Sequence, residues 1–135
     1  MTDSDDFANY FPPNSVSAFI AEHVWEHLSL QEGIDALVNV RFALKMGGAV
    51  RIAVPDRLSY CTSGFGELHR TDMRDEHVVQ FDRGLLSALF LSAGFSEDEI
   101  LTLEHHTETG QHVVHPESNS SPVFQDTNVK VRWRV

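Results

Sequence analysis

The segment from residue 16 to residue 56 carries the pattern of a strand, a helix and a second strand, and this pattern constrains the fold most. Residues 16–22 predict a short strand, residues 30–45 show apolar side chains at helical spacing, and residues 49–54 alternate in character as a strand does. Two parallel strands joined by a helix form a right-handed crossover. The segment therefore indicates an α/β fold.

Local signals set the expected ends of these elements. Ser29 and Glu32 form the pattern of a capping box, in which each side chain satisfies a backbone amide at the start of a helix. Gly47 and Gly48 are expected to end that helix, because glycine readily adopts the left-handed conformation common after a helix. Pro55 and Asp56 are expected to stop the second strand.

The rest of the chain predicts one more helix and two more strands. Residues 57–81 have no regular pattern. A helix that is capped by Asp82 and ended by Gly94 is expected to follow, and residues 98–104 then indicate a strand with Leu101 and Leu103 on one face. Residues 105–126 are polar and predict a long loop or an irregular hairpin, and the last residues alternate as a final strand. Because the strands have one apolar face, we expect helices mainly on one face of a sheet of about four strands.

Composition limits the class of protein. The 135 residues suffice for one domain, preceded by an acidic lead at residues 1–13, and the formal net charge of −10 argues against a nucleic acid or an anionic membrane as partner. No apolar run approaches the ~20 residues of a membrane span. The acidic start differs from a signal peptide and the single cysteine excludes an internal disulfide, so we expect a cytoplasmic protein.

Residues 23–27, His-Val-Trp-Glu-His, match the H-x-x-E-H signature of zinc proteases. On a helix His23 and His27 would share a face, with Glu26 as a base. However, the strand before His23 and the capping box at Ser29 leave room for one helical turn at most, and a catalytic zinc needs a third protein ligand. The sequence therefore favours a structural role at the end of the strand, and we predict no metal site.

Other reactive side chains have simple structural explanations. The histidines at positions 105, 106, 112 and 115 lack a regular ligand spacing, so a solvated loop explains them. Lys130, Arg132 and Arg134 fit the exposed face of a strand, and Cys61 has no activating partner in the sequence.

The stretch from about residue 14 to residue 56 resembles class I S-adenosylmethionine-dependent methyltransferases of the "methyltransferase type 11" kind. The motifs are His23-Val24-Trp25-Glu26-His27-Leu28, and then Gly47-Gly48 leading into a strand that ends in Pro55-Asp56. Asp75-Glu76-His77 and Ser92-Ala93-Gly94-Phe95 extend the likeness. Met46 replaces a proline of the family pattern, and Ser17 replaces an aspartate.

The resemblance implies that the chain corresponds to the C-terminal half of that fold, a partial Rossmann-like sheet with equivalents of the fourth to seventh strands. In the family the first half binds S-adenosylmethionine, with a glycine-rich turn close to the cofactor. Gly64-Phe65-Gly66 comes too late in the sequence to serve as that turn. We therefore expect a methyltransferase-like protein that is inactive alone, binds S-adenosylmethionine weakly or not at all, and is either half of a split enzyme or a non-catalytic interaction or regulatory module.

The resemblance also suggests where a site would lie, because open α/β sheets bind ligands at the carboxyl ends of their parallel strands. The candidate catalytic residues are His23, His77 and Asp56, with either histidine as general base. The candidate cofactor-binding residues are Glu22, Glu26 and His27. Since the fourth strand pairs with the first in the full fold, its free edge or the uncovered sheet face predicts a homodimer, or a partner chain that supplies the missing half.

Overall fold

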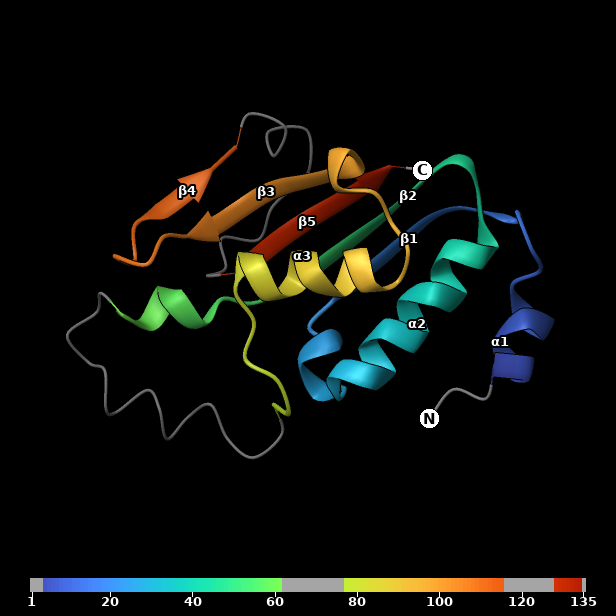
Figure 1. Ribbon diagram of the computed structural model, residues 1–135, viewed down its shortest axis with the longest axis horizontal. Helices are drawn as coiled ribbons and strands as arrows, with labels where there is room; N and C mark the ends of the chain where they lie inside the picture. Colours follow the sequence, from blue (N-terminus) through green and yellow to red (C-terminus); the bar gives the residue numbers. More distant parts are fainter. Residues whose placement is uncertain (1–3, 62–76, 116–127, 135) are drawn as a thin grey trace.

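The computed structural model describes residues 4–61, 77–115 and 128–134, and its centre is a five-stranded sheet in the order β1-β2-β5-β3-β4 (Figure 1). β1 and β2 are parallel, whereas β5 is antiparallel to both β2 and β3. It follows that β1, β2 and β3 run in the same direction and end at the same edge of the sheet. The strand bounds are Val16–Glu22 for β1, Leu44–Pro55 for β2, Ile100–His106 for β3, His112–Val114 for β4 and Asn128–Arg134 for β5.

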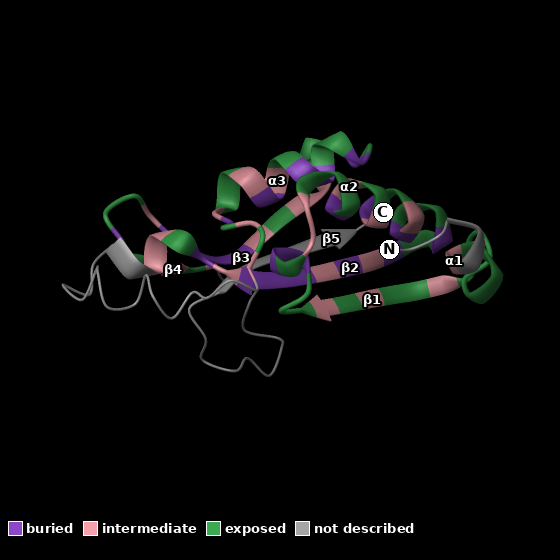
Figure 2. Cartoon of the chain, turned by 90° about the horizontal axis from the view of Figure 1, so that it is seen from below, coloured by how far each residue is buried: buried purple, intermediate pink, exposed green. Residues whose placement is uncertain are grey.

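Two helices cover one face of this sheet, as Figure 2 shows. α2 spans Leu30–Ala43 and α3 spans Arg83–Ser92. From the sheet, Val50, Ile52 and Val54 of β2 are fully buried and belong to one core cluster with residues of both helices. The prediction of a mixed α/β fold is confirmed, and both described crossover helices lie on the same side.

The start of α2 is as predicted, but its end is not. The Ser29 hydroxyl accepts a hydrogen bond from the Glu32 amide (3.3 Å), and the Glu32 carboxylate accepts one from the Ser29 amide (2.9 Å). The prediction that Gly47 and Gly48 end the helix is wrong, because the helix ends at Ala43 and the buried Leu44 already begins β2.

The two glycines serve a bulge in β2 instead. Val16 pairs with Leu44 and Ala18 with Ala49, so two steps along β1 correspond to five along β2. Gly47 has a φ of 74°, in the left-handed region that glycine adopts without steric cost. A Cβ on Gly48 would lie 2.8 Å from the Lys45 carbonyl oxygen, so the bulge also requires the absence of a side chain there.

The signals predicted for α3 are confirmed. The Asp82 carboxylate accepts a hydrogen bond from the Leu85 amide (2.9 Å), and Gly94 after the helix has a φ of 89°. The apolar face of α3 is buried through Leu86, Leu89 and Phe90.

Three features differ from the sequence-based picture. The acidic lead contains a short helix, α1 (Ser4–Tyr10), and Phe7 packs near Phe19 of β1. Leu103 is buried while Leu101 is exposed, because the pairing of β3 with β5 shifts register between Thr102 and Glu104. β4 adds a fifth strand, paired with the end of β3.

The predicted loop at 105–126 contains this β3–β4 hairpin in its described part. The Gly64–Gly66 turn, Asp75, Glu76 and residues 116–126 lie outside the described residues.

β1 forms one edge of the sheet. Among the described residues it pairs with β2 alone, and the side chain of Ile20 is 69% exposed. An apolar residue on an open edge strand is an unusual arrangement for an isolated sheet, since such edges pair readily with further strands. No helix in the described part of the chain is long and apolar enough to cross a membrane.

Candidate functional site

The carboxyl edge of β1, β2 and β3 brings together most of the predicted site residues. β1 ends at Glu22, β2 ends next to Asp56, and β3 ends at His106. Short 3₁₀ helices lie in the described parts of the connections: η1 (Trp25–His27) follows β1, η2 (Arg57–Cys61) follows β2, and η3 (Glu97–Glu99) precedes β3.

The turn after β1 is held in an unusual conformation. His23 has a φ of 55°, a left-handed value that is uncommon for a residue with a side chain. Its amide donates to the Ala53 carbonyl of β2 (3.0 Å), which fixes the turn to the sheet. The buried indole of Trp25 donates to the Gly33 carbonyl of α2 (3.1 Å). These two anchors direct the side chain of Glu26 into the protein.

Glu26 is the centre of a group of ionisable side chains that we call the Glu26 cluster: His23, Glu26, His27 and His77. The Glu26 side chain is 2% exposed, and its Oε1 lies 3.3 Å from His23 Nδ1 and 3.9 Å from His27 Nε2. The rings of His27 and His77 meet edge to face with centroids 5.0 Å apart. Neither carboxylate oxygen of Glu26 accepts a hydrogen bond within the described part of the chain.

The backbone of Glu26 explains how His77 reaches the cluster. The Glu26 carbonyl accepts hydrogen bonds from the amides of Val78 (2.8 Å) and Val79 (3.1 Å). These bonds hold the chain after His77 against η1, although His77 is fifty residues away from His27 in sequence. Local sequence patterns give no indication of this long-range contact.

Glu22 lies apart from the cluster. Its carboxylate forms an ion pair with Arg51 on the neighbouring strand β2. The predicted cofactor-binding residues are therefore divided: Glu26 and His27 belong to the cluster, and Glu22 is engaged across the β1–β2 pair.

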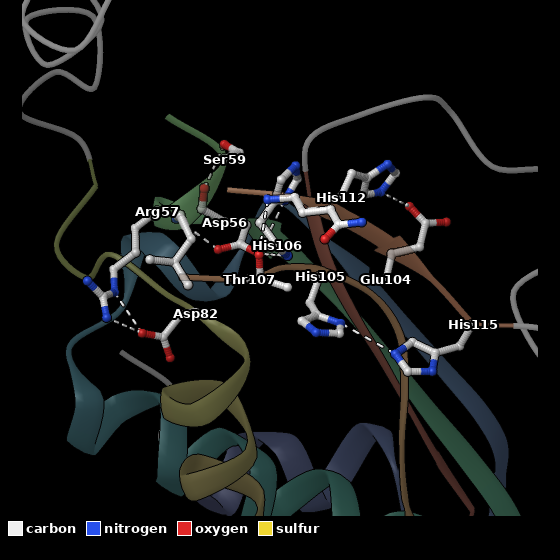
Figure 3. Close-up of polar contacts among 12 residues, drawn as sticks. Asp56, Arg57, Ser59, Asp82, Glu104, His105, His106, Thr107, His112 and His115 are labelled. Carbon is white, nitrogen blue, oxygen red and sulfur yellow. Dashed lines mark hydrogen bonds and ion pairs between the residues drawn. The ribbon is translucent and has the colours of Figure 1, made fainter. Parts of the chain in front are cut away.

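Asp56 has a different environment, shown in Figure 3. It is fully buried, and its carboxylate accepts hydrogen bonds from the amides of Leu58 (3.0 Å) and His106 (2.7 Å). The ring nitrogen Nδ1 of His106 lies 3.4 Å from the same carboxylate. Asp56 thus connects the end of β2 to the end of β3, and the structure places it inside the sheet edge rather than on its surface.

Arg57 makes a second link beside Asp56. Its guanidinium forms an ion pair with Asp82, the residue that caps α3 (Figure 3). Burial alone would raise the pKa of Asp82, but hydrogen bonds from the Leu85 amide and from Arg57, with the Arg57 charge, lower it below its ordinary value.

The prediction that a solvated loop explains the later histidines is wrong for His105 and His106, which are buried at the end of β3. The four histidines form two stacked pairs on and beside the β3–β4 hairpin (Figure 3). The rings of His105 and His115 are stacked with centroids 5.3 Å apart, and those of His106 and His112 with centroids 4.9 Å apart. Burial, then the charges of Arg83 and His115, lower the pKa of His105 below its ordinary value.

A cavity of about 540 Å³ lies elsewhere, between α3 and the first half of β3. Arg83, Ser87 and Leu91 line it from the helix, and Ile100 and Thr102 from the strand. The cavity extends along α3 from Arg83 to Leu91, and its lining contains none of the predicted site residues.

Comparison with known proteins supports the fold alone. No protein-family model and no curated protein matches the sequence. The fold is similar to that of a SAM-dependent methyltransferase from Archaeoglobus fulgidus (TM-score 0.64, 15% identity, 99% of this chain and 66% of that one).

Two further solved structures agree with this likeness. A possible histamine N-methyltransferase from Thermotoga maritima gives a TM-score of 0.57 at 18% identity, over 90% of this chain and 56% of that one. A putative O-methyltransferase from Nostoc punctiforme gives 0.53 at 14% identity, over 93% of this chain and 33% of that one. The chain thus spans less than two thirds of each of these proteins, and its fold is methyltransferase-like.

Proposed function

We propose that this chain is a methyltransferase-like module that provides the second half of a methyltransferase sheet. In this proposal β1, β2, β3 and β5 are equivalent to the fourth, fifth, sixth and seventh strands of the complete methyltransferase fold. The observation that carries the proposal is the sheet order, in which three strands of one direction are interrupted by the antiparallel β5 and β1 is left as an edge. The structural likeness covers nearly all of this chain but at most 66% of the methyltransferases.

The described residues do not fit S-adenosylmethionine by themselves. The described turn after β1 contains no glycine, and the turn after β3, in which Gly110 has a φ of 75°, is a tight hairpin to β4 rather than a glycine-rich loop that leads into a helix. The acidic groups that could bind ribose hydroxyls are engaged, Glu22 by Arg51 and Asp56 by backbone amides. We infer that the cofactor site requires residues from a further segment or a partner.

The side chains that this chain could contribute to proton transfer during methyl transfer are imidazoles. His23 and His77 lie at the carboxyl edge, where either could accept a proton from a methyl acceptor during transfer. Asp56 serves this reaction as a positioning residue, because its carboxylate connects the end of β2 to the end of β3. A substrate is positioned by such a rigid edge more accurately than by a loop.

Calorimetric titration of the purified chain with S-adenosylhomocysteine tests the requirement for a further segment. We expect no binding tighter than about 100 μM, which corresponds to about −5.5 kcal/mol. A tighter dissociation constant that is lost in His77→Ala would contradict the proposal and would indicate a complete methyltransferase site within one chain.

The open edge of β1 offers a place for completion by a second copy of the chain, since a two-fold axis lets one edge pair with itself. Sedimentation velocity at micromolar concentration is expected to give a dimer. Ile20→Lys, which places a charge on the exposed edge, is expected to give a monomer with an unchanged circular dichroism spectrum. A wild-type monomer would contradict this part of the proposal.

A second function, a non-catalytic interaction or regulatory module, is favoured by one observation. The two acidic side chains that end β1 and β2 already make internal contacts, Glu22 with Arg51 and Asp56 with His106. The two functions differ in one measurement: a chain completed by its partner binds S-adenosylhomocysteine if it is half of an enzyme, and does not bind it if it is such a module.

A further inference from the structure

We propose that Glu26, His27 and His77 bind a divalent transition-metal cation of the Zn²⁺ class, with His23 as a positioning residue. One ligand atom from each of the three residues can be chosen so that all lie within 4.8 Å of one another. This proposal is independent of the methyl donor and of how the fold is completed, and with a cation bound to His77 the role of general base would fall to His23. It also differs from the prediction made from the sequence, in which the H-x-x-E-H motif lacked a third ligand.

The fold supplies that third ligand. His77 reaches the motif because the amides of Val78 and Val79 bind the Glu26 carbonyl at 2.8 and 3.1 Å. A metal site of two imidazoles and one carboxylate is the set found in several catalytic zinc sites, where solvent takes the fourth position. Here η1 contributes two ligands and the segment before α3 contributes one.

The state of the Glu26 carboxylate is an independent sign of a ligand. This residue is 1% exposed, and both carboxylate oxygens are buried without a hydrogen-bond partner in the described part of the chain. Native proteins rarely leave such a group unsatisfied, since a buried charge requires a counter-charge or hydrogen bonds. A divalent cation held by Glu26, His27 and His77 would supply the missing charge.

The distances are close to those that a cation needs. Ligand atoms about 2.0–2.1 Å from a tetrahedral zinc ion lie about 3.4 Å from one another. The 3.9 Å between His27 Nε2 and Glu26 Oε1 therefore requires a shift of about half an ångström, in a histidine whose side chain is 41% exposed and able to move. The ligand atoms of the three residues lie within 4.8 Å of one another, so the remaining pairs approach by at most about 1.4 Å. His23 Nδ1, at 3.3 Å from the same oxygen, can orient the carboxylate as outer-sphere groups do at metal sites.

The ligand chemistry selects among cations. Imidazole nitrogens favour Zn²⁺, Co²⁺, Ni²⁺ and Fe²⁺, whereas Mg²⁺ and Ca²⁺ prefer sites composed of oxygen ligands. The partial exposure of His27 leaves the metal open to solvent on one side. The fourth position would therefore accept water or an oxygen atom of a small ligand at the carboxyl edge of the sheet.

The main competing explanation is an ion pair between Glu26 and a protonated His23 or His27, with no metal. The two explanations differ in the role of His77, because His77 takes no part in the contacts of His23 and His27 with the carboxylate. Loss of the His77 imidazole should abolish metal binding in the first case and change nothing in the second.

The test uses the untagged full chain after treatment with a chelator. Titration with Co²⁺, followed by its visible absorption, is expected to show one equivalent bound in a site of low symmetry, and Zn²⁺ is expected to displace it. His27→Ala, His77→Ala and Glu26→Gln are each expected to weaken Co²⁺ binding by at least about tenfold, and His23→Ala by a smaller factor. Excess Mg²⁺ is expected to leave the spectrum unchanged.

His112→Ala is the matched control, because His112 is also about half exposed but lies on β4, outside the Glu26 cluster. Circular dichroism checks that each variant folds. If Glu26→Gln does not fold, the exposed His27 and the half-buried His77 keep the test decisive. Absence of Co²⁺ binding, equal loss of binding in His112→Ala, or retention in His77→Ala would each overturn the proposal.

Discussion

Replacement of Asp56 by asparagine tests whether this residue holds the sheet edge together. The side chain keeps its size, so the change is one of chemistry alone. In the native protein the two carboxylate oxygens accept one backbone amide each, from Leu58 at 3.0 Å and from His106 at 2.7 Å. An asparagine has a single oxygen, and its amide group would face one of these two donors.

The size of the effect follows from the burial of Asp56, which has no exposed surface. A hydrogen bond to a charged group contributes about 1.5–3 kcal/mol, and a buried donor left without an acceptor costs about 1–3 kcal/mol. Because the asparagine loses one such bond and retains a weaker second one, we expect the free energy of unfolding to fall by about 2–3 kcal/mol. For a chain of this size that corresponds to a decrease of about 6–12 °C in the melting temperature.

Urea denaturation followed by circular dichroism measures this difference, with the slope m as a check that the denatured state is unchanged. Asp98→Asn is the control, since Asp98 is an exposed acid in η3, and its effect is expected to stay within about 0.5 kcal/mol. An Asp56→Asn protein as stable as the wild type would refute the positioning role and restore Asp56 as a candidate for direct contact with a substrate.

Three further predictions concern stability. Ser29→Ala removes the hydroxyl of the capping box and is expected to lower the free energy of unfolding by about 1 kcal/mol, measured by urea denaturation; an unchanged midpoint would contradict the role of this cap. Gly94→Ala is expected to cost about 1 kcal/mol in the same assay, because its φ is 89° and the new Cβ meets no atom closer than 3.8 Å, so strain alone acts; a more stable variant would contradict this.

The third prediction is a pH dependence. Since the pKa of His105 is lowered in the folded protein, the unfolded chain binds more protons between that pKa and the ordinary value of 6.5. Stability is therefore expected to decrease as the pH falls below about 6.5, and less steeply in His105→Asn, as followed by melting temperature from pH 7.5 to 5. Equal slopes in the two proteins would contradict the assignment to His105.

Local signals in the sequence predicted most of the architecture. The alternating residues of β2, the capping box of α2 and the Asp82 cap of α3 each depend on residues within four positions of one another, and each is confirmed. The errors arose where a local signal has two physical uses. Gly47 adopts a left-handed conformation, as predicted, but at a bulge within a strand rather than at the end of a helix.

The candidate site was less predictable because it depends on contacts between distant segments. His27 and Glu26 are neighbours in the sequence, but His77 joins them through backbone hydrogen bonds fifty residues away. In the same way, the Asp56 carboxylate accepts a hydrogen bond from the amide of His106, which is 50 residues away in the sequence. No periodicity within a window of ten or fifteen residues contains this information.

Asp56 and Glu26 are buried acids at the carboxyl edge of the sheet, and their environments point to opposite roles. The Asp56 carboxylate is satisfied by backbone amides, which cannot leave without breaking the connection between β2 and β3, so this acid is committed to the fold. The Glu26 carboxylate is equally buried, yet it faces imidazoles rather than amides. Imidazoles can exchange protons or bind a cation, whereas backbone amides can do neither. The contrast between these two acids, rather than any single motif, supports the proposal of a metal or proton-transfer site at Glu26 and its neighbouring histidines rather than at Asp56.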